Sequence, residues 1–190
     1  MLKKLISLFF VLMLLFFVIS CKEDVLPKPS SQLRLDYPVA KYAHFNNHCP
    51  FEFEMNEDAV IKEEKDCGFS IHYPKMKATI YLTYKTVDNN LTGLLKDAQK
   101  LTYEHVIKAD DILEQPYVNY DKKVYGMFYR VNGNAATNAQ FYATDSLKHF
   151  ITGSVYFYAK PKYDSIMPAA DYIKNDMQRL METINWTQGR

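Results

Sequence analysis

Apolar residues fill an unbroken run near the start of the chain, at residues 8–19. Lys3 and Lys4 precede this run, and Cys21 follows it after one serine. A basic start, a short apolar run and a small residue at its end are the parts of an export signal peptide. The run is too short to cross a bilayer comfortably as a helix. We therefore assign residues 1–20 to a signal peptide and exclude them from the fold.

Further along, apolar and polar residues alternate strictly, which predicts half-buried antiparallel strands. The pattern is cleanest at residues 76–85. One face of this strand holds Met76, Ala78, Ile80, Leu82 and Tyr84, and the other holds Lys77, Thr79, Tyr81, Thr83 and Lys85. The remaining expectations for this half are a short edge strand or extended arm at 33–37, irregular chain at 42–50, a strand at 51–55, a solvated hairpin or loop at 57–66, and a strand at 67–73.

After Asn89 and Asn90, either of which suits a helix N-cap, the apolar period becomes helical. This stripe holds Leu91, Leu94, Leu95, Ala98, Leu101 and His105. A second helix is expected at residues 165–185, with Pro168 tolerated because it lies in the first turn. Its stripe holds Ile166, Ala169, Ala170, Ile173, Met177, Leu180, Met181 and Ile184.

The segment between the two helices predicts a meander of strands. Asn132 and Gly133 together are a strong hairpin signal, and the tail after Trp186 is expected to fray. The expected strands are 112–118, weakened by Pro116, then 123–131, 139–144 and 150–160. The fold class is therefore α+β, a mainly antiparallel sheet covered by two amphipathic helices.

The order of these elements resembles the Mog1/PsbP-like α/β/α sandwich, a likeness of fold that implies no function. Residues 33–190 are long enough for one domain. Residues 21–32 contain two prolines and two serines without any periodicity, so we interpret them as a flexible tether.

Charge excludes some partners. Of the 23 lysines and arginines, Lys3 and Lys4 leave with the signal, so 21 basic side chains face 22 acidic ones. The sequence has no stripe of basic residues of the kind that binds nucleic acid. All 15 tyrosines lie in the mature part. Four alternating tyrosines either pack within the sheet or line a sugar-binding platform: Tyr125, Tyr129, Tyr156 and Tyr158.

Two cysteines remain beside Cys21, and an even pair in an exported chain predicts a disulfide between Cys49 and Cys67. Free buried thiols are one alternative. A metal site is another, because His44, His48 and His72 flank the pair; however, the paired C-x-x-C spacing of zinc sites is missing. We expect no bound metal.

No catalytic motif stands in the right context, so we expect neither an enzyme nor a cofactor. Cys67, His72 and Asp66 have the residue types of a thiol nucleophile, its base and an orienting acid. Oxidation of Cys67 is the simpler expectation in an oxidising compartment. His105 and His149 are interpreted as hydrogen-bonded structural residues.

The residues around Cys21 resemble the lipobox of bacterial lipoproteins, which reads Val18-Ile19-Ser20-Cys21 here. That resemblance implies cleavage before Cys21 and acylation of its thiol and amine, with palmitate among the acyl chains. Lys22, Glu23 and Asp24 are similar to a surface-sorting signal of Bacteroidetes lipoproteins. We expect anchoring at the outer membrane facing the periplasm, with the cell surface as the alternative.

Several ordered segments resemble the gliding-motility lipoprotein GldD family of the Bacteroidetes. They are the lipobox, Leu33-Arg34-Leu35-Asp36-Tyr37-Pro38, Cys49-Pro50-Phe51-Glu52-Phe53-Glu54, residues 71–85 and residues 124–146. The resemblance implies a part in gliding and in the linked type IX secretion machinery, with envelope proteins as partners. It implies no catalytic residue. The leading hypothesis is an accessory or scaffold protein; the alternatives are a lipoprotein that binds glycan or peptidoglycan, and a thiol or metal enzyme.

Overall fold

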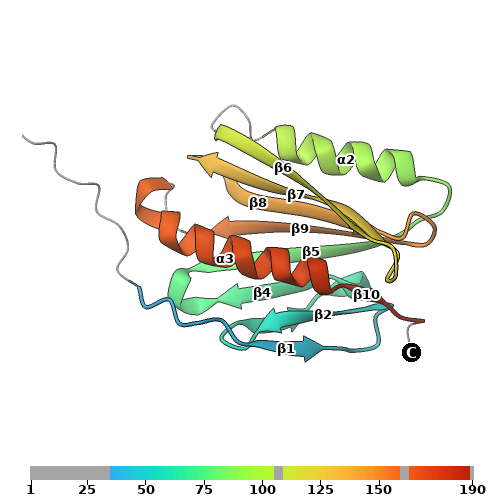
Figure 1. Ribbon diagram of the computed structural model, residues 1–190, viewed down its shortest axis with the longest axis horizontal. Helices are drawn as coiled ribbons and strands as arrows, with labels where there is room; N and C mark the ends of the chain where they lie inside the picture. The colour runs from blue at the N-terminus through green and yellow to red at the C-terminus, as the bar shows by residue number, and fades with distance from the viewer. Residues whose placement is uncertain (1–34, 105–108, 159–162, 189–190) are drawn as a thin grey trace, which may run out of the picture.

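A computed structural model describes residues 35–104, 109–158 and 163–188. The predicted signal peptide, the tether and His105 lie outside these ranges. The described chain forms two antiparallel sheets and two α-helices (Figure 1). The α+β class predicted from the pattern is confirmed, whereas the Mog1/PsbP-like arrangement stays a prediction.

The larger sheet has seven strands, each antiparallel to its neighbours. Their spatial order is β3 (Val60–Glu63), β4 (Phe69–Tyr73), β5 (Ala78–Thr86), β9 (His149–Phe157), β8 (Thr137–Thr144), β7 (Val124–Gly133) and β6 (Ala109–Asn119). The predicted strands from residue 67 onward are present with shifted ends, and residues 57–66 form part of the β3–β4 hairpin. Pro116 is tolerated because β6 is an edge strand.

The smaller sheet consists of β1 (Tyr42–Phe45), β2 (Phe51–Asn56) and β10 (Asn185–Trp186), with β2 in the middle. Two expectations were wrong here. Residues 42–50 are not wholly irregular, because β1 pairs with β2, and β9 is not the last strand, because β10 follows the second helix. Both missed strands are short and depend on β2 for their backbone hydrogen bonds.

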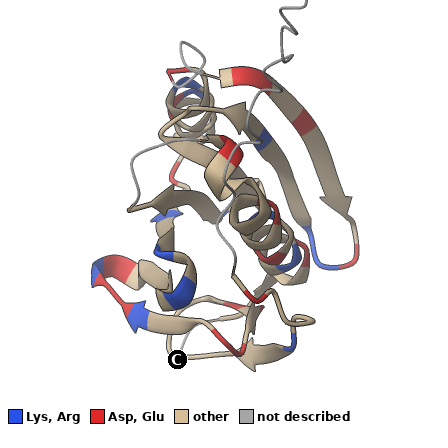
Figure 2. Cartoon of the chain, turned by 90° about the vertical axis from the view of Figure 1, so that its left-hand side faces the viewer, with Lys and Arg blue, Asp and Glu red and all other residues tan. Residues whose placement is uncertain are grey.

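Helix α3 (Tyr163–Thr183) lies between the two sheets, where it contacts β2 on one side and β7, β8 and β9 on the other. Figure 2 looks along α3 and shows the helix in the hollow of the curved larger sheet. Its predicted apolar stripe is buried. Pro168 lies in the second turn, not in the first as expected, because the helix begins earlier, at Tyr163. The residue has no N–H to donate to Asp164.

Helix α2 (Leu91–Tyr103) lies over β8 on the opposite face of the larger sheet. It is a less complete cover than its stripe predicts, because Leu94 is 8% exposed but Leu101 is 40% exposed. Thr102, outside the stripe, is buried and donates a hydrogen bond to Gln140 Oε1 at 2.7 Å. Asn90 is the N-cap residue, but its side chain accepts from the N–H of Asp88 and not from the helix.

The core lies between α3, β2 and the inner face of the larger sheet. Four phenylalanines meet there with ring centroids 5.2–6.2 Å apart: Phe45, Phe51, Phe53 and Phe69. Strand β5 has the predicted inner face of Ala78, Ile80 and Leu82. Residues 35–41 form no strand, so the arm is the correct alternative, and Leu35 and Tyr37 pack against the core.

One hairpin turn and the C-terminal tail complete the comparison. A β7–β8 hairpin follows Asn132 and Gly133, but its turn lies at residues 134–136, because both signal residues end β7 and pair with β6. Gly133 has a φ of +99°, which only glycine adopts easily. The C-terminal tail was expected to fray after Trp186, but Thr187 is still hydrogen-bonded, because its N–H donates to Pro50 O at 2.9 Å.

Candidate functional site

The outer face of the larger sheet carries a row of hydrogen-bonded hydroxyl groups. Alternation along β5 places Thr79 and Tyr81 on this face, away from the core. The hydroxyl of Tyr158, just after β9, lies 2.9 Å from Thr79 Oγ1 and 3.0 Å from Tyr81 Oη. His72 Nδ1 extends the row at 2.9 Å from the same Thr79 oxygen. We call His72, Thr79, Tyr81 and Tyr158 the hydroxyl row.

The hydrogen bonds within the hydroxyl row shift the pKa values of its two tyrosines in opposite directions. The hydrogen bond with Tyr158 raises the pKa of Tyr81 above its ordinary value. The hydrogen bonds with Thr79 and then with Tyr81 lower the pKa of Tyr158. Tyr158 is 63% exposed, so the hydroxyl row reaches the solvent at this residue.

The structure separates the four tyrosines expected to form a platform. Tyr158 belongs to the hydroxyl row, and Tyr156 stands beside it, with its ring centroid 5.9 Å from that of Tyr81. Tyr129 is buried. Tyr125 packs against Tyr120 at 6.3 Å. Tyr81 was missed, although its outward position in the cleanest alternating strand was the signal that could have found it.

The sulfur atoms of Cys49 and Cys67 lie at bonding distance, and their Cα atoms are 5.7 Å apart, as disulfide geometry requires. Only one of the three flanking histidines approaches them among the described residues, since His48 Nε2 lies 3.9 Å from Cys49 Sγ. His44 pairs instead with Glu52 at 3.3 Å. His72 belongs to the hydroxyl row.

His149 is hydrogen-bonded, as expected of a structural residue. Its Nδ1 lies 2.9 Å from Tyr84 Oη, and its ring stacks on Trp186 with centroids 5.1 Å apart. Burial lowers the pKa of His149, although the nearby Asp145 carboxylate opposes that shift. A neutral imidazole fits this position between two aromatic side chains.

A buried carboxylate fastens α3 to the smaller sheet. Asp176 is 2% exposed and accepts hydrogen bonds of 2.7 Å from both Tyr42 Oη and Asn56 Nδ2. Asn56 also donates to Tyr172 Oη at 3.0 Å. Burial raises the pKa of Asp176, and the hydrogen bonds it accepts oppose that shift. Sequence reasoning missed this residue, although it interrupts the apolar stripe between Ile173 and Leu180.

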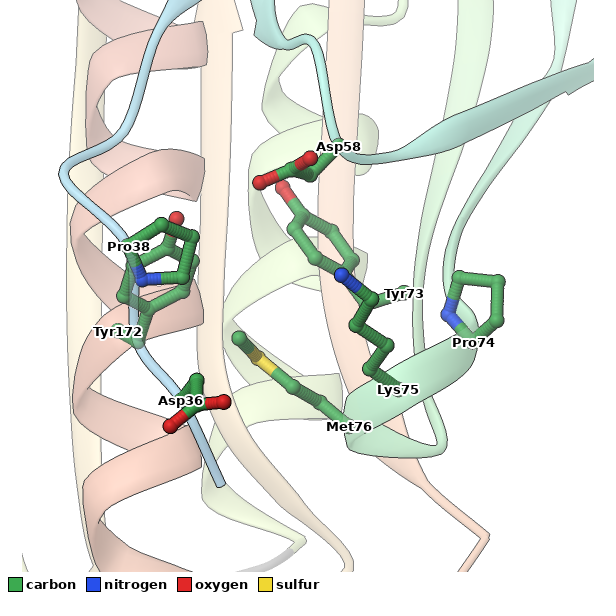
Figure 3. Close-up of a pocket in the computed structure, with 8 residues that line it drawn as sticks. All are labelled: Asp36, Pro38, Asp58, Tyr73, Pro74, Lys75, Met76 and Tyr172. Atoms are coloured by element: carbon green, nitrogen blue, oxygen red, sulfur yellow. The ribbon is translucent and has the colours of Figure 1, made fainter.

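A small pocket lies beside this carboxylate. Figure 3 shows Asp36 and Pro38 of the arm on one side, Tyr73 and Lys75 on the other, and Asp58 above them. Its volume is about 30 Å³, enough for a water molecule but far below the size of ligand pockets. We therefore interpret it as a packing gap between the arm at residues 35–41 and the core, and not as a ligand site.

Lys174 is the second buried charge on α3. It is 1% exposed, and its ammonium donates to Asn132 Oδ1 at 3.0 Å and Tyr163 Oη at 3.3 Å. Burial lowers the pKa of Lys174, while the half-exposed Asp171 opposes that shift. These bonds fasten α3 to the end of β7, so we assign Lys174 a structural role.

The predicted anchor and sorting residues lie outside the described residues: Cys21, Lys22, Glu23 and Asp24. None of the described helices is long and apolar enough to cross a membrane. Acylation and sorting therefore stay predictions from the sequence.

Comparison with known proteins identifies the family. No curated protein matches the chain. A family model described as gliding motility lipoprotein GldD matches residues 22–186, which includes both sheets and both helices. The match covers well over half of the 190 residues. This chain therefore belongs to the gliding motility lipoprotein GldD family.

Proposed function

We propose that this lipoprotein is a scaffold that holds envelope proteins together in the gliding machinery and in the linked type IX secretion machinery. Family membership supports the gliding and lipoprotein part of this proposal. The observation that carries the scaffold part is a region on the outer face of the larger sheet that neither described helix covers. Helix α2 lies over β8, and on the outer face of β5 Tyr81, Thr83 and Lys85 are exposed.

This region, which we call the open face, combines apolar and polar groups. Its side chains are Val60, Lys62, Tyr81, Thr83, Lys85 and Tyr158. Val60 and Tyr158 are 57% and 63% exposed, so two large apolar side chains of this face lie open to solvent. Side chains on neighbouring strands form contiguous rows, and such a surface suits contact with another protein.

Charge on the molecule also suits an assembly role. Figure 2 shows lysines and arginines interspersed with acidic residues. Without a strong field of one sign, recognition depends on local contacts and not on long-range attraction.

The lipid anchor would concentrate the open face near its partners. Acylation at Cys21 and the short tether at residues 21–32 would keep the domain close to the membrane, which we propose is the outer membrane with the domain facing the periplasm. Confinement of this kind raises the effective concentration of membrane-bound partners. Cys21→Ser should release the protein from membranes and abolish fatty-acid labelling; undiminished labelling would contradict the anchor assignment.

The scaffold proposal is tested by placing charge on the open face. In cells that carry Thr83→Glu with Lys85→Glu, gliding and type IX secretion should fail at normal protein abundance, and envelope proteins should no longer co-purify. Thr92→Glu with Lys96→Glu makes the same chemical changes on exposed positions of α2 and is the matched control. Normal gliding in the open-face variant would contradict the proposal, as would loss of gliding in a folded His72→Ala variant that keeps its partners.

The hydroxyl row favours a second candidate, a lipoprotein that binds glycan or peptidoglycan. Exposed tyrosine rings offer an apolar surface to a sugar face, and their hydroxyls offer hydrogen bonds. Tyr81→Phe with Tyr158→Phe keeps the rings and removes the hydroxyls. Purified sacculi should retain the parent protein and lose this variant if glycan binding is the function. Equal retention, or none for either protein, would reject this candidate.

A further inference from the structure

The disulfide is surrounded by further groups that bind metal ions. The ligand atoms of His48, Cys49 and Cys67 all lie within 4.8 Å of one another. Glu63 Oε1 lies 3.2 Å from His48 Nε2, the same nitrogen that faces Cys49 Sγ. Glu63 lies outside this group of three, so its carboxylate would have to move toward the sulfurs on binding. Two sulfurs, one imidazole and one carboxylate are a ligand set that Zn²⁺ accepts in tetrahedral geometry.

Backbone hydrogen bonds hold Cys49 independently of the disulfide. Its N–H donates to Asn47 Oδ1 at 2.9 Å, and its carbonyl accepts from Thr187 Oγ1 at 3.2 Å. The next residue, Pro50, accepts from the N–H of Thr187. Cys49 therefore has a reason to remain in place when the S–S bond is broken.

Cys67 is held in a similar way by the β3–β4 hairpin. The N–H of Glu64 donates to Gly68 O at 2.8 Å, and the N–H of Gly68 donates to Lys65 O at 3.0 Å. These bonds enclose Cys67 from both sides along the chain. Reduction would free its sulfur without removing the hydrogen bonds that close the hairpin.

A reductant has a route to Cys67. This half-buried residue lines an open hollow of about 560 Å³ together with Asp66, Tyr84, Lys85, Thr86 and Asn90. Cys49, in contrast, is 1% exposed. A thiolate entering the hollow would attack the sulfur of Cys67 and displace Cys49 as a thiolate. The second thiol of a dithiol reductant then releases Cys67, so the dithiol supplies both electrons and becomes a disulfide itself.

We propose that reduction converts this disulfide into a zinc site formed by Cys49, Cys67, His48 and Glu63. The two sulfurs must separate to roughly 3.7 Å to occupy two corners of a tetrahedron with Zn–S bonds of about 2.3 Å. Binding displaces the protons of both thiols, and the imidazole binds in its neutral form. Cys49 and Cys67 are then joined in either of two states, by the S–S bond in the oxidised protein and by zinc in the reduced protein. This inference goes beyond the scaffold proposal and does not depend on it.

The full-length lipoprotein in detergent tests the site. It is reduced with a dithiol, freed of reductant without oxygen, and titrated with Zn²⁺ alone or with Co²⁺ as a spectroscopic probe. The reduced protein should bind one ion per chain, show thiolate-to-cobalt charge-transfer absorption and gain thermal stability. The oxidised protein should do none of these.

Two histidine variants provide the control. The His48 side chain is 61% exposed, so His48→Ala should fold normally yet weaken zinc binding by at least about tenfold. His44→Ala removes a similarly exposed histidine that pairs with Glu52 and should bind zinc like the parent. The proposal is overturned by a reduced protein that binds no zinc, by one that unfolds on reduction, or by equal affinity in the two variants.

Discussion

In this protein, single polar side chains join separate segments of the chain through several hydrogen bonds each. Asp145 shows this at the turn between β8 and β9, where one carboxylate oxygen accepts from the N–H groups of Leu147, Lys148 and His149 at 2.8–2.9 Å. The pKa of Asp145 reflects two opposing causes. Burial raises it, but the three backbone hydrogen bonds prevail, so it lies below its ordinary value of 3.8.

Asp145→Asn should destabilise the fold by about 1–2 kcal/mol at neutral pH, because the amide oxygen is a weaker acceptor for three donors. The folded-state pKa is depressed, so the carboxylate stabilises the protein above about pH 4 and that contribution is lost as pH falls through the folded value. Urea unfolding of both proteins across pH 2–7 measures this. Their stabilities should converge at low pH; a constant difference would contradict the assignment.

Asp176→Ala should have a larger effect. It leaves the hydroxyl of Tyr42 and the amide of Asn56 without their buried acceptor, at a cost of about 3 kcal/mol or more. Asp176→Asn keeps one acceptor oxygen and should cost less. Asp97→Ala, on the exposed side of α2, is the control. Denaturant unfolding that ranks the two Asp176 variants alike would show that the carboxylate is not the fastening group.

At the scale of elements, a strand or helix was predicted correctly where its own residues show which face is buried and which is exposed. Strand β5 alternates cleanly because its inner face meets the core and its outer face does not. Strands β1 and β10 were missed because a few residues become a strand only when β2 supplies their partner backbone. The stripe of α2 predicted more burial than occurs, since a helical period cannot reveal how much sheet lies beneath it.

Two glycines allow opposite predictions for the same substitution. Gly93 lies within α2 with no heavy atom near the position of an added Cβ, so Gly93→Ala should stabilise the protein by about 0.5–1 kcal/mol. Gly153 of β9 lies opposite Phe141, whose ring occupies the space of an added Cβ. Gly153→Ala should therefore cost about 1–3 kcal/mol.

Thermal unfolding of the two glycine variants gives the comparison directly. The melting temperature should rise for Gly93→Ala and fall for Gly153→Ala. A fall for Gly93→Ala would mean that α2 packs more tightly than its exposure indicates. An unchanged value for Gly153→Ala would mean that the ring of Phe141 can move aside.

At the scale of the whole molecule, sequence reasoning predicted the α+β class and the family, and it placed the two cysteines that the fold brings together. It missed two separate buried charges, Asp176 and Lys174, because a charge within an apolar stripe is recognised as buried only when its partners are known. It also assigned four tyrosines to one candidate sugar-binding platform, although the structure separates them. Register between strands, which the sequence does not display, brings Thr79 opposite Tyr156 and separates Tyr125 from both.

The central claim is that this domain acts by holding partners through its open face, and site-specific photocrosslinking in living cells tests it most directly. A photoreactive phenylalanine analogue is placed at Tyr81, on the open face, or at Tyr120, which is 79% exposed on the β6–β7 hairpin. The account predicts a defined adduct with an envelope protein from position 81 and none from position 120, in cells that still glide. A gliding strain without an adduct at position 81, or with the same adduct at both positions, would contradict it.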